Sequence, residues 1–128
     1  MKKEIIKVDG IQKPSSPFNH VVKAGDFLFL TSQLSADLRT NKIIGGTMKE
    51  QTRNALNNVK FLMQASGGTM KDIVKVVIYL RDLSKFGEMD AVYREYFEEG
   101  EEPARVTVQA PSPVEKVDVE VEVTAVVS

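Results

Sequence analysis

The sequence predicts an α+β domain in which two helices cover one face of a mixed six-stranded sheet. Valine fills every odd position from 117 to 123, and polar residues fill the even positions between and after them. This period of two is typical of a strand with one apolar and one polar face. Two segments, 47–66 and 84–97, instead repeat apolar residues at helical spacing. With the remaining strand-like segments they give the order β-β-β-α-β-α-β-β, in which two helices can cover only one face of the sheet.

Three strands and a loop are predicted before residue 31. Residues 4–8 alternate between apolar and polar side chains, which indicates a short edge strand. Residues 10–19 form a loop, because its two prolines remove backbone donors and favour extended backbone. Residues 21–22 and 27–30 are expected to pair as a hairpin that turns at the Gly-Asp pair of positions 25–26.

The first helix is expected to begin at Thr47, after a polar loop at 35–46 with a turn near positions 40–41. Thr47 and Glu50 fit a capping box, in which each residue bonds the backbone of the other. The Gly-Gly pair at 67–68 ends this helix. The apolar stripe of the helix consists of Met48, Thr52, Ala55, Leu56, Val59, Leu62 and Met63.

A central strand and a second helix follow. Residues 73–80 are an almost continuous apolar run with several β-branched side chains, which favours a strand inside the sheet. Ser84 is expected to cap the second helix, and Gly100 ends it. The apolar stripe of this helix consists of Phe86, Met89, Val92, Tyr93, Tyr96 and Phe97.

The last two strands, 105–110 and 117–127, are separated by a turn region at 111–113. If they pair antiparallel about this turn, Arg105 and Glu120 lie on one face of the sheet within reach of each other. A face without helices but with scattered apolar residues often packs against another subunit, so we expect an oligomer with sites between sheets. The polar positions expected on that face are Arg105, Thr107, Gln109, Asp118, Glu120 and Glu122.

Composition narrows the class of protein. The 128 residues are expected to form one domain, 1–128, and the net charge of −1 does not favour nucleic acid or an anionic membrane as a partner. The absence of cysteine excludes disulfides, thiolate nucleophiles and thiolate metal sites. His20 is the one histidine and no acidic cluster has metal-loop spacing, so no metal site is predicted and His20 is expected to be a surface or packing residue. No apolar run approaches membrane-spanning length, and we expect a soluble, cytoplasmic protein.

Spacing alone leaves two interpretations of Arg105 equally open, a surface ion pair and a carboxylate-binding fork. Resemblance favours the second. The Pro-Ala-Arg element at 103–105, followed by the Val/Glu alternation of the last strand, closely resembles the C-terminal signature of the RidA/YjgF family of imine and enamine deaminases. Weaker matches to the same family occur in the same order at 17–20, 31–33, 51–59, 72–75 and 79–83.

The resemblance implies a chorismate-mutase-like fold and a homotrimer with a ligand cleft at each subunit interface. It implies hydrolysis of 2-imino acids, such as 2-iminopropionate and 2-iminobutyrate, to 2-oxo acids and ammonia without cofactor or metal. Arg105 lies at the family's carboxylate-binding position, and a lysine would not reproduce its planar fork. Glu120 lies at the position of the glutamate that orients the water.

Three positions depart from the family pattern and bear on substrate choice and rate. Phe18 stands where a tyrosine is usual, Ser32 where a glycine is usual, and Thr107 where many members carry a cysteine. All three are expected to contact the substrate. A trimer that binds or senses a 2-oxo acid without turnover remains the alternative to the deaminase, and a chorismate-mutase-type pericyclic enzyme ranks last because it needs more cationic groups. Nuclease and chaperone roles have no sequence feature here to support them.

Overall fold

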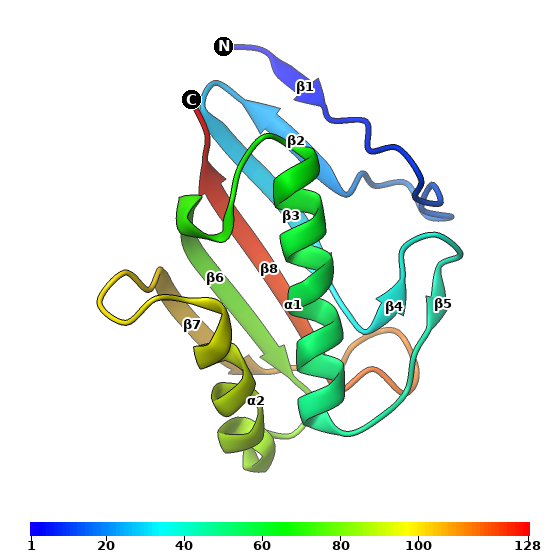
Figure 1. Cartoon of the computed structure of the whole chain (residues 1–128). Coiled ribbons are helices and arrows are strands. Elements are labelled where there is room, and N and C mark those ends of the chain that lie inside the picture. Colours follow the sequence, from blue (N-terminus) through cyan, green and yellow to red (C-terminus); the bar gives the residue numbers. More distant parts are fainter.

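The computed structural model describes the whole chain, residues 1–128 (Figure 1). Its strands and helices, in order, are β1 (Lys3–Ile5), β2 (Val21–Ala24), β3 (Phe27–Gln33), β4 (Ala36–Asp37), β5 (Lys42–Ile43), α1 (Met48–Ala65), β6 (Ile73–Leu80), α2 (Phe86–Tyr93), β7 (Ala104–Gln109) and β8 (Val119–Val126). Three short 3₁₀ turns are η1 (Met70–Asp72), η2 (Leu83–Lys85) and η3 (Arg94–Tyr96). No helix is both long enough and apolar enough to cross a membrane.

The main sheet has six strands in the order β1-β2-β3-β8-β6-β7. Every neighbouring pair is antiparallel except β6 and β7, which are parallel, so the sheet is mixed as predicted. A parallel pair needs a crossover connection, and α2 provides it between β6 and β7. Both helices pack on one face of the sheet, as predicted, and leave the other face without a covering layer (Figure 1).

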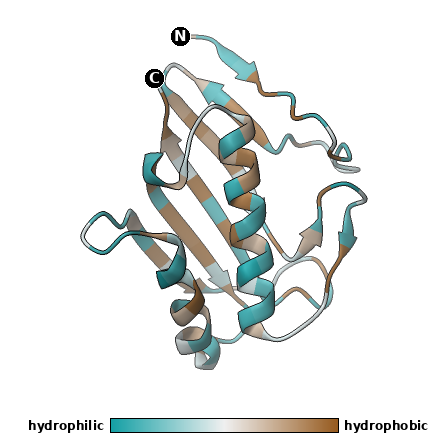
Figure 2. Ribbon diagram, in the orientation of Figure 1, coloured by the Kyte–Doolittle hydropathy of each residue, from teal (hydrophilic) through white to brown (hydrophobic).

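Helix α1 confirms the capping prediction. Thr47 accepts a hydrogen bond from the backbone of Glu50, whose side chain accepts one from the backbone of Thr47. The helix ends at Ser66, and Gly67 follows with a φ of 85° that favours glycine. All seven residues of the predicted stripe are buried. In the sheet beneath α1, β6 is hydrophobic along most of its length, and β8 alternates between hydrophobic and hydrophilic residues (Figure 2).

Two predictions in the first half of the chain need correction. The edge strand β1 covers Lys3–Ile5 rather than 4–8. The predicted loop at 35–46 contains the small hairpin β4–β5, which is separate from the main sheet and turns at Asn41 with a φ of 62°. Each of its strands has only two residues, too few for an alternation of side chains to be recognised in the sequence.

The second helix is shorter than predicted, and Ser84 does not cap it. Helix α2 begins at Phe86 with no side-chain cap, and it gives way to η3 after Tyr93. The capping side chain in this region belongs to Asp82, which accepts a hydrogen bond from the backbone N–H of Ser84 at the start of η2. Asp82, and not Ser84, therefore supplies the capping side chain of η2, and Ser84 takes part only through its backbone N–H.

The predicted pairing of the last two strands is wrong. Strand β6 lies between β7 and β8 and pairs with both. The 110–118 connection passes beyond the end of β6, where Ala110 N donates to Leu80 O and Arg81 N donates to Asp118 O. Consecutive strands are neighbours in about two-thirds of cases. Strands β7 and β8 are an exception, because the crossover through α2 places β7 on the outer side of β6, and β8 pairs with the other side of β6.

The two faces of the sheet differ sharply. The helix-covered face contributes Val21, Leu28, Leu30, Val76, Ile78, Leu80, Val119, Val121, Val123 and Ala125 to the core, each at most 4 % exposed. The open face carries Glu120 and Glu122 but also large apolar side chains that are more than a third exposed, namely Phe27, Phe29, Val106, Val108 and Val126. The open face therefore combines carboxylates with uncovered apolar surface.

Candidate functional site

Arg105 lies on β7 and points to the helix-covered face, because it is the sheet partner of the buried Val76. Its Nη1 donates to Asp90 Oδ1 at 2.8 Å, and its side chain is 23 % exposed. The guanidinium carbon lies 4.6 Å from the ring centroid of Tyr93 and 5.4 Å from that of Phe86. Stacking against two rings and one short ion pair hold the guanidinium in a defined orientation.

Asp90, on α2, is shared by two arginines. Its Oδ1 accepts from Arg105, and its Oδ2 accepts from Arg94 at 3.1–3.2 Å. Burial alone raises the pKa of Asp90, but the hydrogen bond and charge of Arg105 and the charge of Arg94 outweigh burial and lower this pKa below its usual value. The three side chains together carry one net positive charge, which suits an added anion.

A cavity of about 620 Å³ opens beside Arg105, between α2 and the segment that precedes β7. The hydroxyl of Tyr93 is buried without a hydrogen-bond partner, and burial raises the pKa of Tyr93 to about 12. The tyrosine is therefore neutral at physiological pH, and its hydroxyl can donate a hydrogen bond to a bound group. The lining residues are Asp90, Tyr93, Arg94, Phe97, Glu99, Glu102, Pro103 and Arg105.

Thr107 faces the same side of the sheet as Arg105, since its sheet partner is the buried Ile78. Its side chain is half-buried, two residues from Arg105 along β7. Arg105 and Thr107 thus form one half of the predicted site, at the edge strand of the sheet.

Glu120 lies on the open face, as the sheet partner of Tyr79. Its carboxylate accepts a hydrogen bond of 2.6 Å from the hydroxyl of Ser32. Ser32 belongs to an irregular stretch of β3 between Leu30 and Gln33, where the register with β8 shifts. Such bulges turn a side chain out of the regular alternation. Ser32, which the resemblance implied as a substrate contact, donates a hydrogen bond to the carboxylate predicted to orient the water.

Phe18 and His20 lie beside each other in the segment before β2. Phe18 is 47 % exposed, and its ring meets the imidazole edge-on at 6.0 Å between centroids. His20 Nδ1 lies 3.1 Å from the amide nitrogen of Gln33, which donates to it, so the proton of the neutral ring is on Nε2. Burial lowers the pKa of His20, and its Nε2 has no partner. His20 is half-buried between Phe18 and the buried Gln33, a contact that the sequence pattern did not predict.

Phe18 lies in the segment before β2, and the other four predicted site residues divide into two groups on opposite faces of the sheet. Arg105 and Thr107 face the helices, whereas Ser32 and Glu120 lie on the open face. The expectation that Arg105 and Glu120 share a face is wrong, because β6 lies between their strands. Arg105 is level with Val76 of β6, whereas Glu120 is level with Tyr79, and these two residues of β6 point to opposite faces of the sheet. One copy of the chain does not bring both residues to one ligand.

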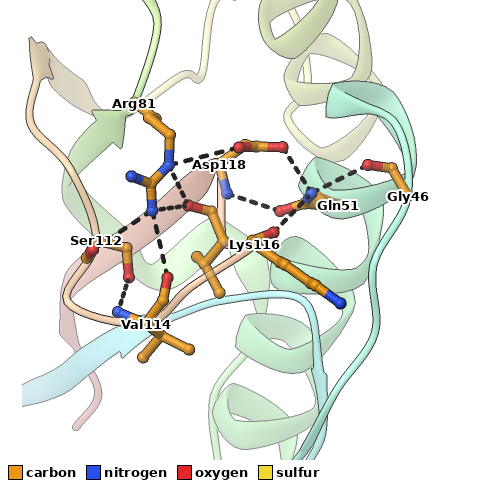
Figure 3. Close-up of polar contacts among 8 residues, drawn as sticks. Gly46, Gln51, Arg81, Ser112, Val114, Lys116 and Asp118 are labelled. Carbon is orange, nitrogen blue, oxygen red and sulfur yellow. Dashed lines mark hydrogen bonds and ion pairs between the residues drawn. The ribbon is translucent and has the colours of Figure 1, made fainter.

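A buried polar network fixes the connection that leads into β8 and Glu120 (Figure 3). Gln51, on α1 and 1 % exposed, donates to Gly46 O, Lys116 O and Asp118 Oδ2 and accepts from Asp118 N. Arg81 donates to the carbonyls of Ser112, Val114 and Val117 from the other side. The local pattern of the sequence does not indicate this role, because Gln51 is one polar residue of an amphipathic helix and its partners lie in a distant segment.

Replacing Gln51 with leucine is expected to lower the free energy of unfolding by about 1–3 kcal/mol, because the substitution keeps the volume but removes four partly buried hydrogen bonds. Urea denaturation at a fixed protein concentration measures the change. The exposed Gln64 of the same helix provides the control, and Gln64→Leu should change stability by less than about 0.5 kcal/mol. Equal effects of the two substitutions would show that the network does not stabilise the fold.

The mixed sheet with two helices on one face defines an α+β domain of the kind found in solved structures of the Rid family. The model of the family described as endoribonuclease L-PSP matches residues 10–127, and the chain belongs to this family. It is 40 % identical over 123 residues to a RutC family protein of Pyrococcus horikoshii, covering 96 % of this chain and 97 % of that protein.

Two further relatives have names or structures that bear on chemistry. A 2-iminobutanoate/2-iminopropanoate deaminase of Dermatophagoides farinae is 31 % identical over 125 residues, covering 98 % of this chain and 97 % of that protein. The crystal structure of E. coli TdcF with bound serine superposes with a TM-score of 0.86 at 29 % identity, covering 98 % of this chain and 99 % of that one.

Proposed function

We propose that this protein hydrolyses 2-imino acids to 2-oxo acids and ammonia, with the substrate carboxylate on Arg105 and the attacking water oriented by Glu120. The proposal rests on the surroundings of Arg105. Its guanidinium lies over two aromatic rings, is oriented by Asp90 and lines a cavity of about 620 Å³. Nη1 is engaged by Asp90, so the remaining guanidinium N–H groups are the ones available to a carboxylate. The deaminase name of one relative and the serine bound to another support the same chemistry.

The reaction needs a water at the imine carbon and a group that moves protons. Water adds across the C2=N bond and gives a carbinolamine, with a hydroxyl and an amino group on C2. The amino group then leaves as ammonia with the proton of the hydroxyl, and the C2 carbonyl of the 2-oxo acid remains. Glu120 accepts a proton from the water and returns it to the departing nitrogen. The hydrogen bond from Ser32 fixes one oxygen of Glu120, which leaves the other oxygen for the water.

A site that uses both residues requires a second copy of the chain. Arg105 and Glu120 lie on opposite faces of one sheet, and the open face exposes several large apolar side chains. We therefore propose a closed homotrimer in which the edge strand of one subunit meets the open face of the next, so that Arg105 of one subunit and Glu120 of its neighbour share a ligand. Closed symmetry gives three equivalent sites.

Light scattering is expected to give about three times the monomer mass of 14.2 kDa at micromolar concentration. Phe29→Asp places a charge on the open face and should dissociate the assembly. Phe61→Asp provides a matched control, because Phe61 is similarly exposed (45 % against 47 %) but lies on α1. A wild-type monomer, or equal dissociation by both variants, would contradict this arrangement.

The function is tested by ammonia release from 2-iminopropionate and 2-iminobutyrate generated in situ by a serine/threonine dehydratase. The protein should accelerate release above the spontaneous rate, and Arg105→Ala should abolish most of the acceleration. The alternative is a trimer that binds a 2-oxo acid without turnover, in which case calorimetry shows binding and the ammonia assay shows no acceleration. The Ser32–Glu120 hydrogen bond favours the enzyme, because a sensor needs the arginine but not an oriented carboxylate.

A further inference from the structure

The cavity beside Arg105 has an unequal distribution of charge. In this cavity the one negative charge of Asp90 is shared by Arg94 and Arg105, which leaves one positive charge without a counter-charge. Glu99 and Glu102 line the same cavity, and neither carboxylate takes part in an ion pair. Glu102 accepts one hydrogen bond, from the backbone of Gly100 at 2.7 Å. A carboxylate bound to Arg105 therefore leaves two further carboxylates, those of Glu99 and Glu102, in the same cavity without a counter-charge.

A second feature of the same cavity indicates a ligand larger than a three-carbon acid. Tyr93 lines the cavity and is only 5 % exposed, yet its hydroxyl has no partner within the chain. A buried hydroxyl without a partner costs free energy unless a bound group or a water satisfies it. The volume of about 620 Å³ falls in the range of pockets that hold whole small molecules and exceeds what a 2-oxo acid with a methyl side chain fills.

We propose that the preferred substrates of this site are 2-imino acids whose side chain ends in a cation, such as the imine derived from arginine. This inference rests on the proposed function and deepens it. The substrate carboxylate binds Arg105, the side chain passes along Tyr93 and Phe97, and the terminal cation lies between Glu99 and Glu102. The same two glutamates repel a second carboxylate, so imines of acidic amino acids are the poorest substrates.

The test compares two substrates of nearly the same shape. An L-amino acid oxidase generates the 2-imino acids of arginine and of citrulline, in which a neutral urea replaces the guanidinium. Wild-type protein should show a kcat/KM about fivefold to tenfold higher for the arginine-derived imine, the size expected when two partly exposed carboxylates each add a modest charge interaction. The ratio should fall as ionic strength rises.

The variants separate this charge interaction from general effects. In the double variant Glu99→Gln/Glu102→Gln the ratio of the two substrates should fall toward one. Glu101→Gln is the control, because Glu101 belongs to the same segment but does not line this cavity, and it should keep the wild-type ratio. A wild-type ratio near one, or an unchanged ratio in the double variant, would overturn the inference.

Equilibrium binding distinguishes failure of the inference from failure of the proposed function. Calorimetric titration with 2-oxo-5-guanidinopentanoate and its ureido analogue measures the charge preference without any turnover. Absence of turnover with every imine refutes the deaminase, while a preference for the guanidino acid in calorimetry still supports the cationic subsite. Turnover of both imines with equal affinity for the two 2-oxo acids refutes the subsite and leaves the deaminase standing.

Discussion

Arg105→Ala is expected to lower both the affinity for a 2-oxo acid such as 2-oxobutyrate and kcat/KM by roughly thirty-fold to several-thousand-fold. The substitution removes the charge-assisted hydrogen bonds to the ligand carboxylate and leaves that carboxylate in the cavity without a partner, at a cost of about 2–5 kcal/mol. Arg105→Lys should recover only part of this, because a point charge does not match the planar fork. Calorimetric titration and ammonia release measure the two effects.

Arg105→Ala is also expected to lower the stability of the protein, because Arg105 lies on the helix-covered face and not on the polar, helix-free face where the sequence placed it. Arg105 stacks on Tyr93 and Phe86 and is a partner of Asp90 on the helix-covered side, so its loss should lower the free energy of unfolding by about 1–3 kcal/mol. Arg105 lowers the pKa of Asp90, so the charge part of this contribution is present above the unfolded pKa of about 4 and is lost as pH falls below it. The difference in stability between wild type and variant should therefore shrink at pH 3.

The control for Arg105 is Arg39→Ala, which breaks a bidentate pair with Asp37 at a surface site with a 78 % exposed arginine. This variant should bind the 2-oxo acid as wild type does. Circular dichroism establishes that each variant is folded at the temperature of the titration. A folded Arg105→Ala protein that binds as tightly as wild type would remove the carboxylate site, and with it most of the case for deamination.

Glu120→Gln is expected to lower kcat by about 100-fold or more while changing the affinity for a 2-oxo acid by less than about threefold, because general acid–base groups contribute to the reaction rather than to binding. The amide keeps the shape of the side chain and still accepts from Ser32, but it no longer takes a proton from water. Steady-state kinetics of ammonia release and calorimetry give the two numbers.

Glu122→Gln provides a matched control for Glu120. Glu122 lies on the same strand and the same face, and it likewise accepts a short hydrogen bond, 2.7 Å from the hydroxyl of Tyr79. Its replacement should leave kcat within about threefold of wild type, as expected for a carboxylate outside the reaction. If Glu120→Gln instead weakens binding and leaves turnover intact, Glu120 is a binding group and the role of water orientation belongs to another residue.

The sequence by itself determined most of the local elements and the α+β class of the fold. Thr47 and Glu50 predicted the start of α1 because a capping box involves residues only three apart, and the observed hydrogen bonds confirm it. The alternation after residue 117 predicted which residues of β8 face the core, since the side-chain period of a strand is two. The same short motifs identified the family, which the matched region of 10–127 confirms.

The tertiary structure decided which strands are neighbours, and therefore which functional residues share a face. The periodicity of β7 and β8 says which side chains lie together on each strand, but it does not say that β6 lies between the two strands. That order follows from the crossover through α2, a contact between residues far apart in the chain, and it puts Arg105 and Glu120 on opposite faces. Gln51 shows the same limit, because this buried polar residue of α1 finds partners 65 and 67 residues away. Local patterns report interactions over a few residues, whereas strand order and buried polar networks are chosen by the packing of the whole chain.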